Sequence, residues 1–518
     1  MEENKRENEK YMIIIKNKNI LKYVHIALII LGAIFVLLSN FHTSIWFDES
    51  YSVGIASHSI QEIWSIGSND VHPVLYYIIL HFVGLFTGNS ILSYRLISSV
   101  CIIVLAILGF THIRKDFGEK VGIIFSFLVL FMPVVLAYSG EIRMYTMAML
   151  FVTIMAIYAY RIYKSGVSNK NWVIFTIFSL ASCYTHYYAL AAAFVINIAL
   201  FLYFLINNIK QKNYEVKYKK YSGNLKRSII SAIVQIILYL PWLGTLISLT
   251  VGSSKTGFWI GKPDFMQIFE FQFTGNLDSV YLVRNFSYVF SVIILLYIIF
   301  LIIKYWKNAK PAKIALVLYA AIILLVGILS IIVTPILYAR YFLVITGILL
   351  LAFAYLMALD ESKIRVFLIC TLIVIASCMT NIKLIQINYD KSNNEPLEFV
   401  QNNIQNEDIF LIDNRGSGFV VSQHFKNNEL YFWDVENWNV DEAYKAFGNT
   451  VHNLDSLQDY TGRIWVISDN PEFLKKVVET FGEDKVEVKD EKYFDTQYKT
   501  YKYDISLIIK KGILWKKT

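Results

Sequence analysis

Two consecutive carboxylates, Asp48 and Glu49, directly follow an apolar run of membrane-spanning length. A carboxylate at the depth of a membrane surface is costly unless it has a partner or a task. One such task is that of a general base, which takes a proton from a nucleophile. A bare acidic pair is also typical of a solvated loop start, so the rest of the loop must distinguish these two interpretations.

The same loop contains a second polar segment, residues 70–77, which reads Asp-Val-His-Pro-Val-Leu-Tyr-Tyr. Pro73 suits the first turn of a helix, because its missing N–H would have no partner there in any case. The apolar residues 75–86 are too few to span a bilayer, so we expect a helix that lies in the membrane interface. Asp70 and His72 would then lie at its start.

More ionisable and aromatic side chains stand at the predicted outer ends of other apolar runs. Glu141 and Tyr145, for example, are four residues apart and therefore share one face of a helix. Each residue alone is more often a helix-end anchor, but together they predict one outer pocket. The candidates outside the first loop are Arg95, Glu141, Arg143, Tyr145, His186, Tyr187, Arg340 and Tyr341.

These side chains must be held by membrane helices. The 518-residue chain is 56% hydrophobic and 17% charged, whereas soluble proteins have about 45–50% apolar and roughly 25% charged residues. The excess lies in runs of about 20 apolar residues, enough to cross a bilayer as a helix. This excludes a soluble enzyme, a disordered chain and a small secreted scaffold. It also disfavours an outer-membrane barrel, whose strands alternate in polarity.

The apolar runs predict an all-α polytopic membrane portion with about eleven transmembrane helices. The expected cores are residues 22–41, 91–112, 120–138, 143–162, 171–187, 189–209, 228–250, 286–304, 313–334, 340–359 and 364–384. Lysine and arginine are concentrated in alternate loops, whereas residues 42–90 contain neither. Since basic loops stay in the cytoplasm, we expect a multi-pass cell-membrane protein with its N-terminus inside and its first long loop and C-terminus outside. The net charge of +8 follows from this asymmetry and requires no nucleic-acid partner.

From residue 385 onward the apolar runs shrink to strand length. The predicted strands are residues 409–413, 429–434 and 463–469, and the predicted helices are residues 395–405, 441–447 and 471–481. This alternation indicates a small soluble α/β domain. We interpret residues 416–418, which read Gly-Ser-Gly, as a tight turn from strand to helix.

The chain therefore divides into three parts. Residues 1–21 form a cytoplasmic tail, residues 22–384 a transmembrane domain, and residues 385–518 an extracytoplasmic α/β domain.

The order of these motifs resembles that of GT-C fold glycosyltransferases of the family 39 type, which are similar to protein O-mannosyltransferases and the lipid A aminoarabinose transferase. The resemblance covers residues 20–360. It is carried by Asp48-Glu49, the 70–77 segment, Arg95, residues 141–145, residues 185–188 and Arg340-Tyr341. It implies a GT-C membrane domain that is catalytic, with interfacial helices in the first outer loop.

The resemblance also implies an activity. A hexosyl- or pentosyltransferase of this kind moves a sugar from a polyprenyl-phosphate donor in the bilayer to an extracytoplasmic acceptor, which is a wall polymer, a glycolipid or a protein. Asp48 takes the role of the base, with Glu49 beside it, and a single displacement inverts the anomeric carbon. No cofactor is required, but a divalent metal is compatible with ligands such as Asp70, His72, Glu141 and His186.

Two groups of side chains follow from this activity. The first binds the donor phosphate, which guanidinium groups recognise bidentately; it comprises Arg340, His72, Arg95, Arg143 and Tyr341. The second lines the acceptor or sugar pocket; it comprises Tyr51, Asp70, Tyr76, Glu141, Tyr145, His186 and Tyr187.

Three other functions share some of these features. A transporter or flippase of lipid-linked sugars would place ionisable residues near mid-bilayer and show paired halves, whereas here they lie at outer helix ends. A polysaccharide polymerase or ligase also uses lipid-linked sugars, but it does not need an acidic pair after the first span. A membrane-anchored binding protein would not need about eleven spans.

Overall fold

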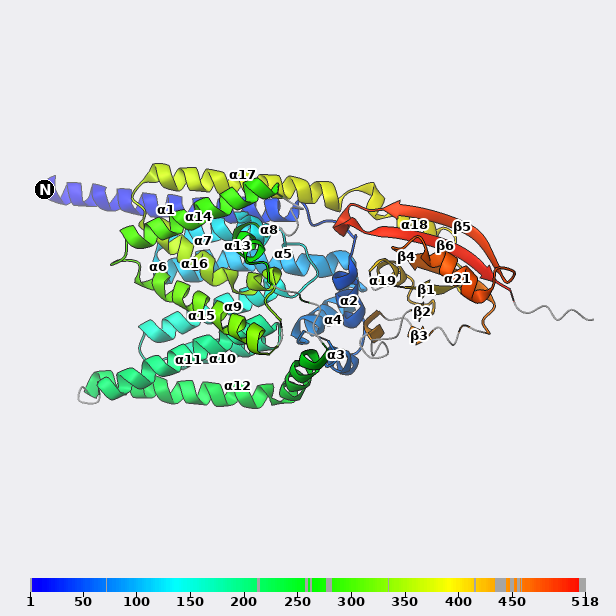
Figure 1. Ribbon diagram of the computed structural model, residues 1–518. Helices are drawn as coiled ribbons and strands as arrows, with labels where there is room; N and C mark the ends of the chain where they lie inside the picture. The colour runs from blue at the N-terminus through cyan, green and yellow to red at the C-terminus, as the bar shows by residue number, and fades with distance from the viewer. Residues whose placement is uncertain are drawn as a thin grey trace, which may run out of the picture. The chain divides into compact units, whose positions relative to one another are not determined.

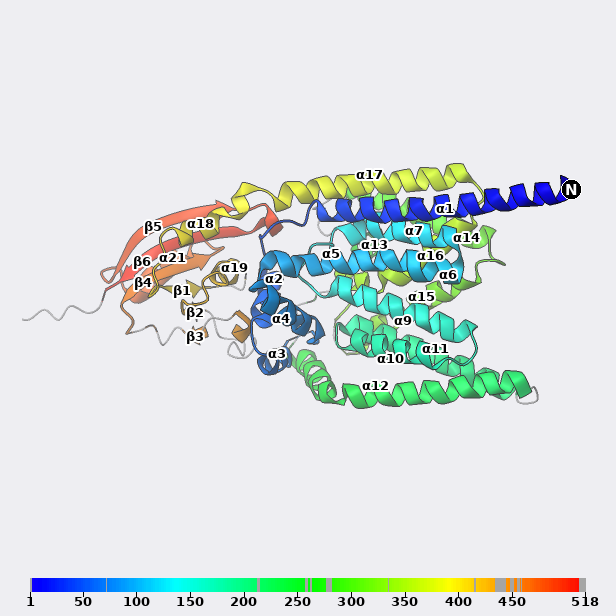
Figure 2. The same cartoon turned by 180° about the vertical axis from the view of Figure 1, so that it is seen from behind.

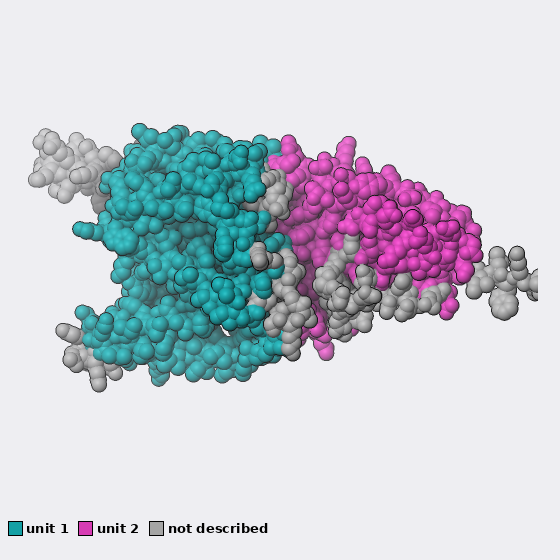
Figure 3. All heavy atoms as spheres, in the orientation of Figure 1, with its two compact units in different colours: residues 1–39, 97–140, 144–382 teal, residues 40–96, 141–143, 383–518 magenta. Residues whose placement is uncertain are grey.

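The computed structural model describes residues 2–70, 72–211, 215–256, 260, 263–275, 282–333, 335–413, 416–433, 444–447, 451–453, 457 and 459–511. The chain falls into two compact units, which have different colours in Figure 3. One comprises residues 1–39, 97–140 and 144–382, and the other residues 40–96, 141–143 and 383–518. We call them the helical unit and the composite unit. The composite unit joins the first long loop to the C-terminal domain.

Long apolar helices dominate the chain (Figure 1). In the part that the structure describes, nine segments are long and apolar enough to cross a membrane. They are Asn19–Leu37 in α1 (Glu2–Leu37), Ile91–Phe117 (α5, Ile91–Leu108; η1, Gly109–Ile113; α6, Arg114–Phe117), Tyr145–Lys164 (α9), Tyr187–Lys210 (α11), Lys219–Val251 in α12 (Glu215–Thr256), Arg284–Lys304 (α14), Lys310–Ile332 (α15), Ala339–Leu359 (η2, Ala339–Phe342; α16, Leu343–Leu359) and Lys363–Asn388 (α17).

The two other expected spans are shorter helices. Residues 120–138 form α7 (Glu119–Phe131) and α8 (Pro133–Leu136), which are separate because Pro133 lacks the N–H that a continuous helix needs. The span expected at residues 171–187 corresponds to α10 (Asn169–Cys183), and a further short helix is α13 (Phe265–Thr274). The expected polytopic, all-α membrane portion is therefore confirmed.

The helical unit packs through small and polar side chains. Helices α9 to α12 lie against their neighbours in sequence, and α1 lies beside α17, far along the chain (Figures 1 and 2). There Asn381 Nδ2 donates a hydrogen bond of 2.8 Å to the carbonyl of Phe35. A Cβ at Gly122 in α7 would lie 2.6 Å from the carbonyl oxygen of Gly109 in η1. These backbones approach closely, as small residues allow in membranes.

The loop part of the composite unit contains three helices: α2 (Phe47–Ala56), α3 (Ile60–Gly67) and α4 (Leu75–Thr87). Helix α3 begins with a capping box, in which the Ser59 and Glu62 side chains each accept the other's backbone N–H. Helix α4 ends at Gly88, whose φ of 64° suits glycine. A helix at residues 75–86 is thus confirmed, while its place in the membrane interface stays a prediction.

The C-terminal part of the composite unit is a six-stranded sheet of order β3-β2-β1-β4-β6-β5. Strands β3, β2, β1 and β4 run parallel to one another, whereas β6 is antiparallel to both β4 and β5. Its elements are η3 (Lys391–Asn393), α18 (Glu395–Gln401), β1 (Ile409–Ile412), α19 (Ser417–Ser422), β2 (Leu430–Phe432), η4 (Tyr444–Phe447), β3 (Val451–Asn453), β4 (Gly462–Ser468), α21 (Phe473–Phe481), β5 (Val486–Asp495), η6 (Tyr498–Thr500) and β6 (Lys502–Lys510).

The predicted α/β domain is confirmed, with its three predicted strands as β1, β2 and β4. The helices at 395–405 and 471–481 appear as α18 and α21, and the Gly-Ser-Gly segment is the turn from β1 into α19. Of the predicted helix at 441–447, residues 441–443 lie outside the described residues, and the rest is the short 3-10 helix η4. The sequence did not reveal β5, because most of its side chains are exposed and charged, a common device at a sheet edge.

Candidate active site

Helix α2 presents Asp48 and Glu49 in its first turn. Consecutive helical residues point about 100° apart, since a turn takes 3.6 residues. The side chain of Glu49 is 0% exposed, whereas that of Asp48 is 18% exposed. The two neighbouring carboxylates therefore face different surroundings.

Glu49 forms a closed network with Arg95, which we call the buried ion pair. Arg95 Nη1 and Nη2 lie 2.9 and 3.3 Å from Glu49 Oε1 and Oε2. The hydroxyl of Tyr498 donates to Oε2 at 2.8 Å, and the backbone N–H of Ile142 donates to Oε1 at 2.8 Å. Buried charges need such partners, because each loses its hydration on folding. Both oxygens of Glu49 are therefore engaged within the protein.

Arg95 also organises the chain that leads into α2. Its Nε and Nη2 donate to the carbonyls of His42 and Ser44, at 3.2 and 2.5 Å. Burial, together with the nearby positive charge of Arg95, lowers the pKa of His42 to about 2. Arg95 was a predicted phosphate-binding residue, but its side chain is 1% exposed. The structure brings Arg95 to Glu49 instead of to an open pocket.

A second, more accessible group of charges surrounds Asp48, and we call it the rim: Asp48, Glu141, Arg143 and Lys499. Arg143 Nε lies 4.0 Å from Asp48 Oδ2, and its Nη1 donates to the Asp48 carbonyl at 3.1 Å and to Ser52 Oγ at 3.2 Å. Lys499 Nζ lies 3.0 Å from Glu141 Oε1. The rim thus combines two carboxylates with two cations.

Tyrosine side chains of α2 and α4 lie close to these charges. The Tyr77 hydroxyl donates to Asp70 Oδ2 at 3.2 Å, and the Tyr77 ring contacts the rings of Tyr51 and Tyr76. Burial, with the negative charges of Asp70 and Asp48 nearby, raises the pKa of Tyr77 well above its usual value. Tyr77 therefore contacts three residues of the predicted sugar pocket, Tyr51, Asp70 and Tyr76, while His72 is buried just before α4.

Most of the remaining predicted residues form an aromatic cluster in the helical unit. Tyr145, His186 and Tyr341 contact one another, with ring centroids 5.0 to 6.1 Å apart. The half-buried Arg340 guanidinium lies 5.9 Å from the Tyr145 ring centroid. Tyr187 accepts a hydrogen bond of 3.3 Å from the Trp242 indole. This cluster joins α9, α11 and η2, whose residues are far apart in sequence.

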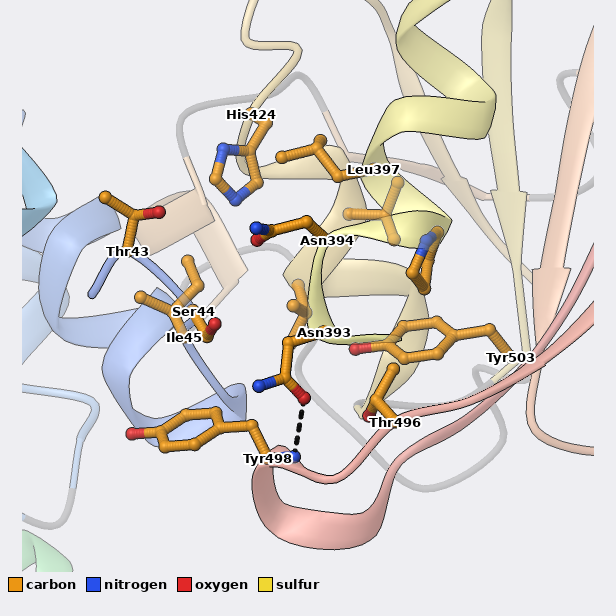
Figure 4. Close-up of a pocket in the computed structure, with 13 residues that line it drawn as sticks. Thr43, Ser44, Ile45, Asn393, Asn394, Leu397, His424, Thr496, Tyr498 and Tyr503 are labelled. Atoms are coloured by element: carbon orange, nitrogen blue, oxygen red, sulfur yellow. Dashed lines mark hydrogen bonds between the residues drawn. The ribbon is translucent and has the colours of Figure 1, made fainter. Parts of the chain in front are cut away.

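Sequence reasoning missed the contribution of the turn between β5 and β6. This turn supplies Tyr498 to the buried ion pair and Lys499 to the rim. The Tyr498 backbone N–H donates to Asn393 Oδ1 at 2.8 Å, beside a small pocket lined also by Ser44, His424 and Tyr503 (Figure 4). No motif marks residues 498 and 499, so only the fold could reveal them.

The described residues offer no obvious metal centre. Among them, no three His, Cys, Asp or Glu side chains gather closely enough to hold a metal ion. Participation of a divalent ion stays a prediction.

Comparison with known proteins identifies the fold. No protein-family model matches the chain, and no curated protein matches its sequence. The structure is similar to that of ArnT from Cupriavidus metallidurans in the apo state, with a TM-score of 0.55 and 8% identity, and to ArnT bound to undecaprenyl phosphate, with 0.56 and 9%. Each match covers 94% of this chain and 97% of ArnT. The chain therefore has the GT-C fold of polytopic membrane proteins, as the sequence resemblance implied.

Proposed function

We propose that this protein is an integral-membrane glycosyltransferase that moves a sugar from a polyprenyl-phosphate donor to an acceptor outside the cytoplasm. The shared fold supports this proposal, because it extends over almost the whole of both chains and ArnT binds undecaprenyl phosphate. One observation carries it: Asp48 keeps a partly exposed carboxylate beside the fully enclosed Glu49. A general base needs such access to its substrate.

In the proposed reaction, an oxygen of the Asp48 carboxylate takes the proton from the acceptor nucleophile. The nucleophile attacks the anomeric carbon of the sugar, and the bond from that carbon to the phosphate oxygen breaks. The electron pair leaves on the phosphate, and the single displacement inverts the anomeric configuration. Glu49 is not needed as a second nucleophile, and its engaged oxygens suit it to hold α2 in place.

Arg340 is our first candidate for binding the phosphate in the helical unit. Its guanidinium is half-buried between aromatic rings, and charge-assisted hydrogen bonds to phosphate contribute about 1.5–3 kcal/mol. Arg340→Ala should weaken donor use about 10- to 100-fold while the protein keeps its thermal unfolding temperature. Arg340→Lys should restore little, because the bidentate fork is lost. Full activity with lysine would instead indicate simple surface charge.

Transfer can be tested directly with purified protein in lipid vesicles. We expect radiolabel from a polyprenyl-phosphate sugar to appear in a new, acceptor-linked product. A flippase would move the intact donor between leaflets without a new product, and a polymerase would yield chains of repeated units. Lack of transfer from all sugar donors, with movement of intact lipid, would overturn the proposal.

We also propose that the N-terminus is cytoplasmic and that residues 385–518 lie outside. The alternation of basic loops supports this orientation. Single cysteines at Gly416 and Lys219, in a background without the native cysteines, should react differently with a membrane-impermeant reagent on intact cells. Labelling is expected at position 416, whereas labelling at position 219 would indicate the opposite orientation in the membrane.

A further inference from the structure

The turn between β5 and β6 has a demanding backbone conformation. The Thr496 N–H donates to the Tyr501 carbonyl at 2.9 Å and so closes the turn. Within it, Lys499 and Thr500 have φ of 55° and 51°. This left-handed region favours glycine, and a β-branched residue there is a genuine outlier. Such conformations persist where surrounding contacts over-determine them, and they cluster at functional sites.

Three contacts hold this turn against the rest of the composite unit. The Tyr498 hydroxyl donates to Glu49, and its N–H donates to Asn393 (Figure 4). The hydroxyl of Tyr501 accepts the N–H of Phe47 at 3.2 Å. These anchors flank Lys499 on both sides in the sequence, so the position of its Cα is fixed at the rim.

The lysine side chain itself is the most accessible of the three cations described around Asp48 and Glu49. It is 31% exposed, compared with 6% for Arg143 and 1% for Arg95. Its ammonium group lies 3.0 Å from Glu141 Oε1 and 4.5 Å from the Trp46 ring centroid. Both arginines direct donors into the protein, whereas a lysine on a flexible stem can turn to another anion.

We infer that Lys499 binds a phosphate ester at the rim, so that the C-terminal domain supplies a substrate-binding side chain. The choice of ligand rests on the proposed function, in which the phosphate belongs either to the lipid-linked donor or to a phosphate-bearing acceptor. Glu141 holds the ammonium group in the absence of this ligand. A phosphate then competes with Glu141 for the same donor atoms.

The test measures binding to the full-length protein in nanodiscs, with undecaprenyl phosphate in one arm and sn-glycerol 3-phosphate in the other. Lys499→Gly removes the charge, and its fit to the left-handed backbone offsets part of the stability that is lost with the Glu141 ion pair. We expect it to weaken binding about 10- to 100-fold in the arm that carries the true ligand. Lys499→Arg should keep most of the affinity.

Two further variants separate ligand binding from a purely structural role. Lys502→Ala removes the same charge from an exposed position on β6 and should leave both affinities unchanged. Glu141→Gln removes the competitor and should tighten binding. Unchanged affinity of Lys499→Gly in both arms, or no binding by the wild type in either, would overturn the inference. If the wild type binds neither ligand but still transfers a sugar, the inference about Lys499 is wrong and the proposed function still stands.

Discussion

The buried ion pair and the rim lie side by side in the composite unit, yet they differ in almost every physical respect. In the buried ion pair, Glu49 and Arg95 are enclosed, and their oxygens and nitrogens are bonded within the protein. In the rim, Asp48 and Lys499 keep part of their surface exposed, and Arg143 Nε lies 4.0 Å from the Asp48 carboxylate. Two adjacent residues of like charge can therefore differ in what they do: one stabilises the fold, and the other stays accessible to a substrate.

The largest expected effect concerns Asp48. Asp48→Asn keeps the shape but removes the proposed base, so sugar transfer should fall by about 10²–10⁴-fold while thermal unfolding in detergent stays unchanged. Glu49→Gln should instead lower the yield of folded protein, with a smaller loss of rate per folded molecule. A near-normal rate for Asp48→Asn together with an inactive but stable Glu49→Gln would exchange the two roles. Normal rates for both would remove this loop from the chemistry.

The next effect concerns stability alone. Arg95→Ala leaves the carboxylate of Glu49 buried without its cation, which should destabilise the protein by about 3–5 kcal/mol. Replacing Arg95 and Glu49 together by methionine should restore much of this loss, because no buried charge then remains. Thermal unfolding of the single and double variants measures the coupling. Equal losses for both would show that the pair contributes only packing.

A smaller effect is expected where α2 meets the C-terminal domain. A Cβ at Gly54 would lie 1.8 Å from the carbonyl oxygen of Ala446 in η4, so the backbones would have to separate. Gly54→Ala should cost about 1–3 kcal/mol of stability. Gly244→Ala is the matched control, since its Cβ would meet open space. An unchanged unfolding temperature for Gly54→Ala would show that η4 does not pack tightly on α2.

The smallest effect appears as pH dependence next to the buried ion pair. His42 has a pKa of about 2 in the folded protein, below its ordinary 6.5, so the folded state keeps it neutral. The stabilisation that comes from keeping His42 neutral is present above pH 6.5. Below that pH the folded state loses about 1.4 kcal/mol of stability per pH unit of acidification. His42→Gln should therefore flatten the fall in stability between pH 6.5 and 5. Thermal unfolding measured across this pH range gives the slope, and an equally steep fall in the variant would contradict the prediction.

Much of the fold could be predicted from the sequence. Runs of apolar residues located the membrane helices, and the shift in composition near residue 385 located the α/β domain. Hydropathy could not distinguish long spans from the shorter helices α7, α8 and α10, because break points such as Pro133 depend on local hydrogen bonding. It also missed β5, whose exposed and charged face lacks a strand's usual alternation.

The sequence selected several residues of the candidate site but not their pairings. The sequence selected Asp48, Glu49, Arg95 and Arg143, but spacing along the chain cannot say which carboxylate an arginine meets. Lys499 carried no signal, because its role depends on where a distant turn folds back. Burial determines which carboxylate belongs to the buried ion pair and which to the rim. Burial depends on the folded structure, so the sequence alone does not give it.

The hydrogen bond between Tyr498 and Glu49 joins residues 449 positions apart, which has a consequence for biosynthesis. At roughly 5–20 residues per second, the ribosome needs about 20–90 s to reach the second partner after making the first. During that interval Glu49 lacks one of its donors, so the first loop stays incomplete until almost the last strand has been made. A nascent chain stalled before Tyr498 should therefore expose α2 to protease, and release of the full chain should protect it.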